Sequence, residues 1–235
     1  MTGTEIIRFS KVFISKLEPA EGPVPTPAQW LLYLNWAIET VSVEIRQVDQ
    51  AVPFTLVAGQ ASYPLIKGSN LTKTVLEPHL VVINGNPLRT ASGRDYGLWA
   101  MSELNYFRPT WRTSENATPS AAAGQGGNVL ILDPPPTADV VSAGESYIAG
   151  IVKAEGLTAL TETPDLPADT HMALAAYTAI RIAKPAAASV EAASILQGLA
   201  PDAAQAVARA KDRNDLALSE TGDTFGAYIP DYMDL

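Results

Sequence analysis

The chain has 235 residues, of which 47% are hydrophobic and 17% are charged. This length fits one large domain or two small ones, and the hydrophobic fraction excludes wholesale disorder. The sequence contains no cysteine, which excludes disulfides, thiolate zinc sites, iron–sulfur clusters and thiol catalysis. The net charge of −9 argues against a protein that grips nucleic acid by neutralising phosphates with Lys and Arg.

Two helices are predicted in the first fifty residues. Apolar residues with spacings of three and four give one stripe, at Ile6, Phe9, Phe13 and Leu17. Four prolines between Leu17 and Pro27 predict a linker. Thr26 then offers an N-cap hydroxyl, and Pro27 suits the first turn of a long second helix. The apolar seam of that helix continues to Val48.

Short β-rich runs follow, from Pro53 to about Ile151. They comprise residues 54–57, 62–65, 80–83, 128–132 and 146–152. Asn84-Gly85 is the strongest short signal for a hairpin, since both central positions of a type I′ turn need a positive φ. One or two helical turns, capped by Asp95, are predicted between Asp95 and Asn105. A parallel β-α-β rhythm is absent from the pattern, which favours an antiparallel sandwich or small barrel.

After Pro167 the sequence again predicts helices. Alanine, the best helix former, supplies 17 of the 43 residues from 168 to 210. Breaks at Pro185 and at Gly198–Pro201 divide this region into predicted helices at 168–184, 186–197 and 201–218.

The last segment, residues 220–235, lacks a helical period and alternates acidic with aromatic residues. We expect an extended tail that docks on a partner, and the alternative is an arm that packs on its own bundle. The docking residues would be Phe225, Tyr228, Ile229, Tyr232 and Met233.

These elements predict an α+β fold with three parts. Residues 1–50 and 156–219 form a helical bundle from both ends of the chain. Residues 51–155 form an inserted antiparallel β-sandwich or barrel lobe, and residues 220–235 form the C-terminal tail.

Candidate catalytic residues are sparse. The two histidines, His79 and His171, are interpreted as structural, and Gly124-Gln-Gly126-Gly127 as a hairpin tip rather than a phosphate loop. Two carboxylate pairs fit a helix start and a solvated helix face, at Asp165 with Asp169 and at Asp212 with Asp215. We therefore predict no enzyme, no metal site and no cofactor. The start of the chain does not read as a secretion signal, and no apolar run predicts a membrane span.

Aromatic and basic residues interleave at one place. The stretch contains Tyr106, Phe107, Arg108, Trp111 and Arg112. It could bind a protein, form part of the core, or stack on nucleic-acid bases, and a protein interface is favoured because Tyr, Trp, Phe and Arg dominate such contacts. An alternative class is a non-viral β-sandwich binding module for a carbohydrate or a protein, with a helical oligomerisation bundle and with Trp99, Tyr106 and Trp111 as an exposed platform for a glycan.

Five motifs in order resemble the head-to-tail adaptor (connector) proteins of tailed bacteriophages, including the tail tubular protein A group. They are Leu31-Leu-Tyr-Leu-Asn35-Trp-Ala-Ile, Phe54-Thr-Leu-Val-Ala-Gly59-Gln-Ala-Ser-Tyr63-Pro-Leu, Val81-Val-Ile-Asn-Gly85-Asn-Pro-Leu88-Arg, Asn128-Val-Leu-Ile-Leu-Asp-Pro134-Pro-Pro, and Pro164-Asp-Leu-Pro167 with the helix start that follows it. Within the resemblance, residues 54–65 correspond to a first β-hairpin.

The resemblance implies a structural virion protein at the head–tail junction, synthesised in the host cytoplasm. Such proteins form a dodecameric ring that joins the portal protein to a tail or nozzle protein and continues the DNA channel. The implied partners are the portal, the next tail component and further copies of this chain, and the tail at 220–235 would dock on the portal. No membrane partner is implied.

The acidic balance fits DNA as cargo. Residues 156–235 contain 11 acidic and 5 basic residues and carry −6 of the net −9. A basic channel lining would hold the phosphates of moving DNA during packaging and ejection, whereas an acidic or neutral lining repels them. We therefore expect acid-rich positions along the channel and passage of DNA without specific binding.

Overall fold

The structure is a computed structural model that describes residues 1–17, 25–68, 70–89, 97–125, 129–185 and 189–227. The chain divides into two compact units. The first comprises Met1–Gln47 and Lys153–Asp215, and the second comprises Val48–Val152 and the C-terminal residues from Leu216. The prediction of an α+β fold, with helices from both ends of the chain and an inserted β lobe, is confirmed.

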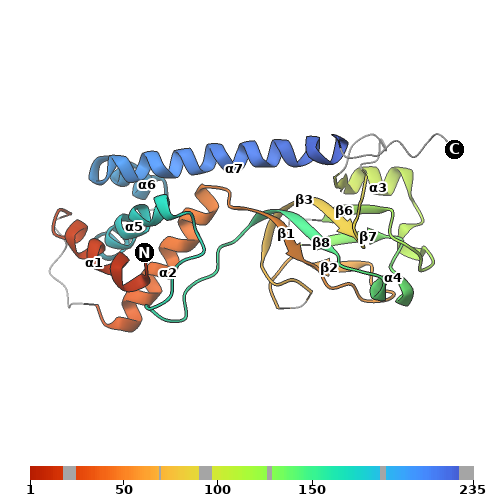
Figure 1. Cartoon of the computed structure of the whole chain (residues 1–235), viewed down its shortest axis with the longest axis horizontal. Helices are drawn as coiled ribbons and strands as arrows, with labels where there is room; N and C mark the ends of the chain where they lie inside the picture. Colours follow the sequence, from red (N-terminus) through yellow and green to blue (C-terminus); the bar gives the residue numbers. More distant parts are fainter. Residues whose placement is uncertain (18–24, 69, 90–96, 126–128, 186–188, 228–235) are drawn as a thin grey trace. The chain divides into compact units, whose positions relative to one another are not determined.

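The first unit is organised around helix α5 (His171–Ala183), which packs against α1 (Gly3–Ile14), α2 (Pro27–Glu44) and α6 (Ser189–Leu199) (Figure 1). Nine of the thirteen residues of α5 are buried, and four of these nine are alanine. Small side chains allow several helices to approach one central helix, because the distance between helix axes depends on the side chains at the contact. The alanine-rich composition therefore produces a tight bundle.

The N-terminal helices begin where local capping predicts. Thr2 and Glu5 form a capping box at the start of α1, and Thr26 and Gln29 form a second one at the start of α2. Helix α2 ends at Glu44, earlier than the predicted seam to Val48. Arg46 takes a positive φ of 49° and turns the chain out of the helix, so that Val48 opens the first strand.

The C-terminal helices differ from the prediction at their ends. A short 3₁₀ helix, η2 (Ala168–Thr170), precedes α5, and α7 runs from Pro201 to Ala227. The expected helix end at 218 and the expected extended conformation of 220–227 are therefore wrong. The glycines in this stretch each cost only about 1 kcal/mol in a helix, and the next proline, the stronger breaker, is residue 230. Residues 228–235 lie outside the described part of the chain.

The second unit contains two four-stranded sheets. The first has the order β1-β8-β3-β4 and is antiparallel; its strands are β1 (Val48–Pro53), β8 (Tyr147–Val152), β3 (Val75–Ile83) and β4 (Asn86–Pro87). The second has the order β2-β7-β6-β5, with β2 (Ser62–Pro64), β7 (Val129–Asp133), β6 (Ala121–Gln125) and β5 (Trp99–Ala100). The pair β5·β6 is parallel, a short exception to the predicted antiparallel arrangement.

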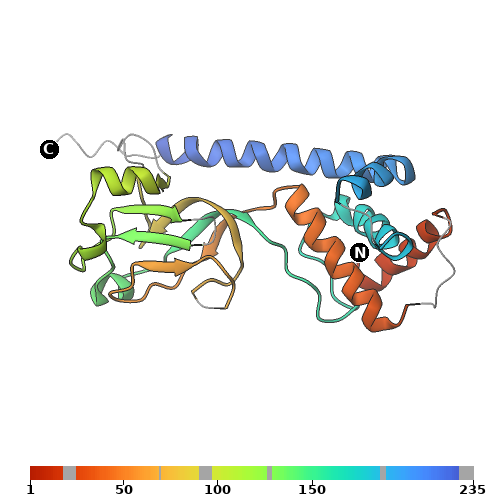
Figure 2. The ribbon, with the colours of Figure 1, turned by 180° about the vertical axis from the view of Figure 1, so that it is seen from behind.

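The two sheets share one hydrophobic core, which makes the unit a sandwich. In strand β7, Leu130 and Leu132 belong to this shared core, whereas Ile131 belongs to a second cluster on the opposite face. Helix α3 (Met101–Phe107) and the 3₁₀ helix η1 (Trp111–Thr113) contribute Leu104 and Trp111 to that second cluster. Figure 2 shows α3 beside β6 and β7 from the rear. The sheet is therefore buried on both faces near α3.

Three local predictions for the β unit can be compared with the structure. Asn84 and Gly85 have φ values of 50° and 78°, as the predicted hairpin between β3 and β4 requires. The predicted strand at 62–65 is confirmed as β2, whereas the predicted strand at 54–57 and the hairpin at 54–65 are wrong, because β1 ends at Pro53 and β2 pairs with β7 in the other sheet. The predicted helix after Asp95 begins only at Met101, and Asp95 itself lies outside the described residues.

Candidate interaction site

Helix α3 places the predicted aromatic stretch on the surface of the β unit. The helix begins after Ala100, whose N–H donates to Oε2 of Glu103 at 2.7 Å. Leu104 is fully buried against the sheet and fixes the rotation of the helix. The last turn then carries Tyr106 and Phe107, which are 79% and 60% exposed. Two large aromatic side chains are thus adjacent and open to solvent.

The exposed rings rest on one another and on a buried tryptophan. The ring centroids of Tyr106 and Phe107 are 4.9 Å apart, with the ring planes at 90°. Phe107 also contacts Trp99 edge to face, with centroids 6.3 Å apart. Trp99 is only 8% exposed, and its indole N–H donates to the Arg89 carbonyl at 2.7 Å. The buried, hydrogen-bonded Trp99 therefore supports the exposed pair Tyr106 and Phe107 in a defined position.

A second tryptophan braces the other side of the helix. Trp111 is 9% exposed, and its indole N–H donates to Oδ1 of Asn105 at 2.9 Å. The guanidinium of Arg112 lies over the Trp111 ring, 4.4 Å from the centroid. Both indole rings are already buried and hydrogen-bonded in the free protein. These two side chains therefore lose little further conformational entropy when a partner binds.

Arg108 connects this surface to the sheet. Its guanidinium lies 5.2 Å from the Trp99 ring centroid, and its Nη1 is 2.9 Å from Oδ2 of Asp133 at the end of β7. Asp133 is 2% exposed, and its Oδ1 is buried without a hydrogen-bond partner in the described structure. The Arg108 cation is thus used within the fold, which does not favour a phosphate-binding role.

We call Tyr106, Phe107, Arg108, Trp111 and Arg112 the α3 aromatic cluster. All five lie on α3, on η1 or between these two elements, but their roles differ, since Tyr106 and Phe107 are exposed whereas Trp111 belongs to the core. The alternative glycan platform is not formed as predicted, because Trp99 and Trp111 are buried and only Tyr106 of its three residues is open to solvent. Rigid exposed aromatic residues of this kind are typical anchors of protein interfaces.

The predicted tail residues are mostly beyond the description. Phe225 lies within the backbone span of α7, and its side chain is not described. Tyr228, Ile229, Tyr232 and Met233 lie outside the described residues. Their docking role stays a prediction.

Several of the histidines and carboxylates considered for catalysis have structural contacts. His171 is buried, with Nδ1 2.9 Å from the Met1 amino group and Nε2 3.1 Å from the Leu166 carbonyl oxygen. Asp169 pairs with Arg213, and Asp215 pairs with Arg46, each at 2.9 Å.

Among the described residues, no group of three or more His, Cys, Asp or Glu could hold a metal ion. None of the described helices combines the length and apolar character needed to cross a membrane.

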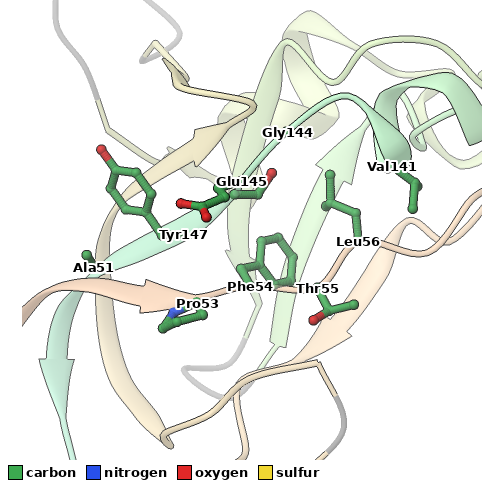
Figure 3. Close-up of a pocket in the computed structure, with 10 residues that line it drawn as sticks. Ala51, Pro53, Phe54, Thr55, Leu56, Val141, Gly144, Glu145 and Tyr147 are labelled. Carbon is green, nitrogen blue, oxygen red and sulfur yellow. The ribbon is translucent and has the colours of Figure 1, made fainter.

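A groove of about 400 Å³ lies at the end of the sandwich beside helix α4 (Ala138–Ser142), and we call it the α4 groove. Its floor includes Phe54 and Leu56, and Figure 3 shows the Phe54 ring between the Glu145 carboxylate and Thr55. The Phe54 N–H donates to the Ser146 carbonyl at 2.9 Å, which ties the floor to the start of β8. Sequence reasoning missed this groove because residues 54–57 were assigned to a strand, whereas they form an irregular segment.

Comparison with known proteins identifies the family. A family model described as SU10 adaptor protein matches residues 1–223. Since this match spans nearly the whole chain, the chain belongs to that family and is a structural adaptor protein of a bacteriophage. Virion structural adaptors associate with portal and tail proteins, and the family is typically non-enzymatic. No curated protein matches the chain.

Proposed function

We propose that the chain forms a ring at the head–tail junction, where it joins the portal to the next tail component and continues the DNA channel. The family supports the adaptor role, and the observation that carries the interface is the exposed pair Tyr106 and Phe107 on a braced helix. Ring stoichiometry of twelve, and the finer similarity to the tail tubular protein A group, rest on the sequence resemblance.

The α3 aromatic cluster serves as a protein-docking surface in this proposal. The rings are presented on a sheet that is packed on both faces, so little conformational entropy is lost when a partner covers them. Truncating such anchors typically costs more than 1 kcal/mol of binding free energy, or about fivefold to tenfold in affinity. The partners to be tested are the portal protein and the tail or nozzle protein.

The experiment compares the double variant Tyr106→Ser/Phe107→Ser with the wild-type chain. Co-sedimentation with portal rings and with the tail protein is measured for both, and negative-stain images record whether rings form. Leu32→Ser is the matched control, because Leu32 is also an exposed apolar residue but lies on α2. Loss of one partner by the double variant alone supports the docking role, and undiminished binding of both partners rejects it.

The C-terminal residues form a second proposed contact, with the portal. Because α7 continues to Ala227, a stop after this residue removes Tyr228, Ile229, Tyr232 and Met233 and leaves the described helix intact. We expect this truncated chain to lose co-sedimentation with portal rings. Full retention of portal binding would remove the tail from the proposal and leave the α3 aromatic cluster untouched.

The charge distribution supports the proposed passage of DNA. Residues 156–235 hold most of the net negative charge, and repulsion from an acidic lining lets a polyanion slide. A reconstruction of the assembled ring identifies the side chains on the channel. Acidic or neutral side chains there agree with the proposal, and a lining dominated by Lys and Arg contradicts it.

A further inference from the structure

The α4 groove is acidic at its rim and apolar at its floor. Phe54 and Leu56 are buried on the floor, and the half-buried Val141 extends the apolar surface toward α4. Glu145 is the only charged residue among those that line the groove, it is exposed, and it has no ion pair with any residue that the structure describes. A volume of about 400 Å³ is within the range of known ligand pockets, roughly 300–1,000 Å³. The groove thus suits an apolar side chain with a cation beside it.

Helix α1 presents the complementary surface. Phe9 and Val12 are exposed and lie one helical turn apart, so they occupy the same face. Arg8 lies on that face, four residues before Val12, is exposed, and has no ion-pair partner within the described ranges. Lys11, also exposed, adds a second positive charge beside the apolar pair. We call these four residues the α1 face.

A closed ring needs two different surfaces on every copy, because each subunit contacts one neighbour with one surface and the other neighbour with another. We propose that the α1 face of one copy binds in the α4 groove of the next copy, with Phe9 and Val12 over Phe54 and Leu56 and with Arg8 opposite Glu145. This inference rests on the proposed ring. It assigns one subunit contact to a helix-in-groove interaction.

Three other exposed apolar residues, Phe107, Leu32 and Val43, fit the groove less well. Phe107 is followed by Arg108, whose cation is already paired with Asp133. Leu32 and Val43 on α2 are eleven positions apart, so they do not share one turn. Within the described ranges, the α1 face joins two neighbouring exposed apolar side chains to Arg8, which has no ion pair or ring contact there, whereas the exposed Arg112 of the α3 aromatic cluster already lies over the Trp111 ring.

Disulfide trapping tests the contact directly. The chain has no cysteine, so every disulfide between its copies must use the introduced thiols, and peptide mapping separates the heterologous pair from pairs of identical positions. Val12→Cys combined with Thr55→Cys places one thiol on the α1 face and one on the rim of the groove. Val43→Cys with Thr55→Cys is the control, because Val43 is about as exposed as Val12 but lies on α2. The full chain is oxidised in the presence of portal rings, and native mass spectrometry records ring formation separately.

We expect a ladder of cross-linked chains for the first pair and about tenfold less for the control pair. Adding Glu145→Arg to the first pair places like charges opposite each other and should lower the yield severalfold, and further addition of Arg8→Glu should restore it. Rings without the specific ladder, equal ladders for both pairs, or no rescue by the reversed charges would each overturn this contact and leave the ring itself standing. Absence of both rings and ladders would instead reject the proposed function together with the contact.

Discussion

Asn35 in helix α2 exchanges two hydrogen bonds with the backbone of Leu157. Its Nδ2 donates to the Leu157 carbonyl at 3.0 Å, and its Oδ1 accepts from the Leu157 N–H at 2.7 Å. The amide side chain therefore acts as the backbone partner that an irregular segment would otherwise lack. Gly156 permits this approach, since a Cβ there would lie 3.0 Å from Asn35 Cγ. The pair fastens the returning chain to the helical unit.

Replacing Asn35 should destabilise the helical unit. Asn35→Ala leaves a donor and an acceptor of Leu157 without their partners, so we expect a loss of about 1–3 kcal/mol in the free energy of unfolding. Asn35→Asp keeps the acceptor for the Leu157 N–H but sets a carboxylate oxygen against the Leu157 carbonyl, and it should not recover wild-type stability. Urea unfolding curves measure both effects.

The control for this prediction is Gln205→Ala. Gln205 is an exposed amide on α7, and substitutions at such positions usually change stability by less than about 0.5 kcal/mol. Equal unfolding midpoints for Asn35→Ala and the wild type would contradict a structural role for the Asn35–Leu157 pair.

The position of Asn35 illustrates which features the sequence could predict. The Thr26 cap and the Asn84-Gly85 turn depend on a few neighbouring residues, and both were predicted correctly. The end of α2 at Glu44, with the positive φ of Arg46 after it, carries no comparable local signal. The partner of Asn35 lies 122 residues away, so periodicity could not identify it.

The candidate site shows the same division between local and distant causes. The sequence singled out the α3 aromatic cluster because aromatic and basic residues alternate there. It could not separate exposed Tyr106 from buried Trp111, because that difference arises only when α3 and η1 cover the second face of the sheet. The α4 groove depends on contacts between residues 51–56 and 141–147, and composition gives no sign of it.

Gly150 in β8 should not tolerate a side chain. A Cβ at this position would lie 2.3 Å from the Glu77 carbonyl oxygen and 2.9 Å from Pro78 Cα, both on the backbone of β3. Since a backbone cannot rotate away as a side chain can, Gly150→Ala should cost about 3 kcal/mol or more. Thermal unfolding measures this loss. Gly124→Ala in β6 is the matched control, because a Cβ there meets no atom within 4 Å; a similar loss for both variants would contradict the steric explanation.

The Arg108–Asp133 pair should contribute to stability through burial of the carboxylate. Arg108→Ala leaves a carboxylate that is 2% exposed without its cation, and breaking buried pairs costs about 3–5 kcal/mol. Because the Arg108 side chain is 33% exposed, we expect a smaller loss, about 2–3 kcal/mol. Arg108→Ala/Asp133→Asn should lose less than Arg108→Ala alone, since the uncompensated charge is gone.

Chemical denaturation of these variants is compared with Arg213→Ala. Arg213 pairs with Asp169 at the same 2.9 Å, but both side chains are substantially exposed, so its removal should cost less than about 1 kcal/mol. If the two arginine variants lost equal stability, burial of Asp133 would not be the cause.

His171 should make the helical unit sensitive to mild acid. Burial lowers the pKa of His171 below its ordinary value of 6.5, and the hydrogen bond with the Leu166 carbonyl opposes this shift only in part. The unfolded chain therefore binds a proton at a higher pH than the folded chain does. The stability that the neutral His171 ring contributes is fully present above pH 6.5, the ordinary pKa of the unfolded chain's histidine. It is lost as the pH decreases from 6.5 toward the lower pKa of the folded protein.

Unfolding midpoints of the wild type and of His171→Gln, measured between about pH 8 and about pH 5.5, test this dependence. His171→Gln should lower stability at the upper pH but should flatten the decline between the two values. Gln205→Ala is the control, since the exposed amide of Gln205 carries no titrating proton and should leave the slope unchanged. A wild-type slope that survives in His171→Gln would assign the acid sensitivity to another group.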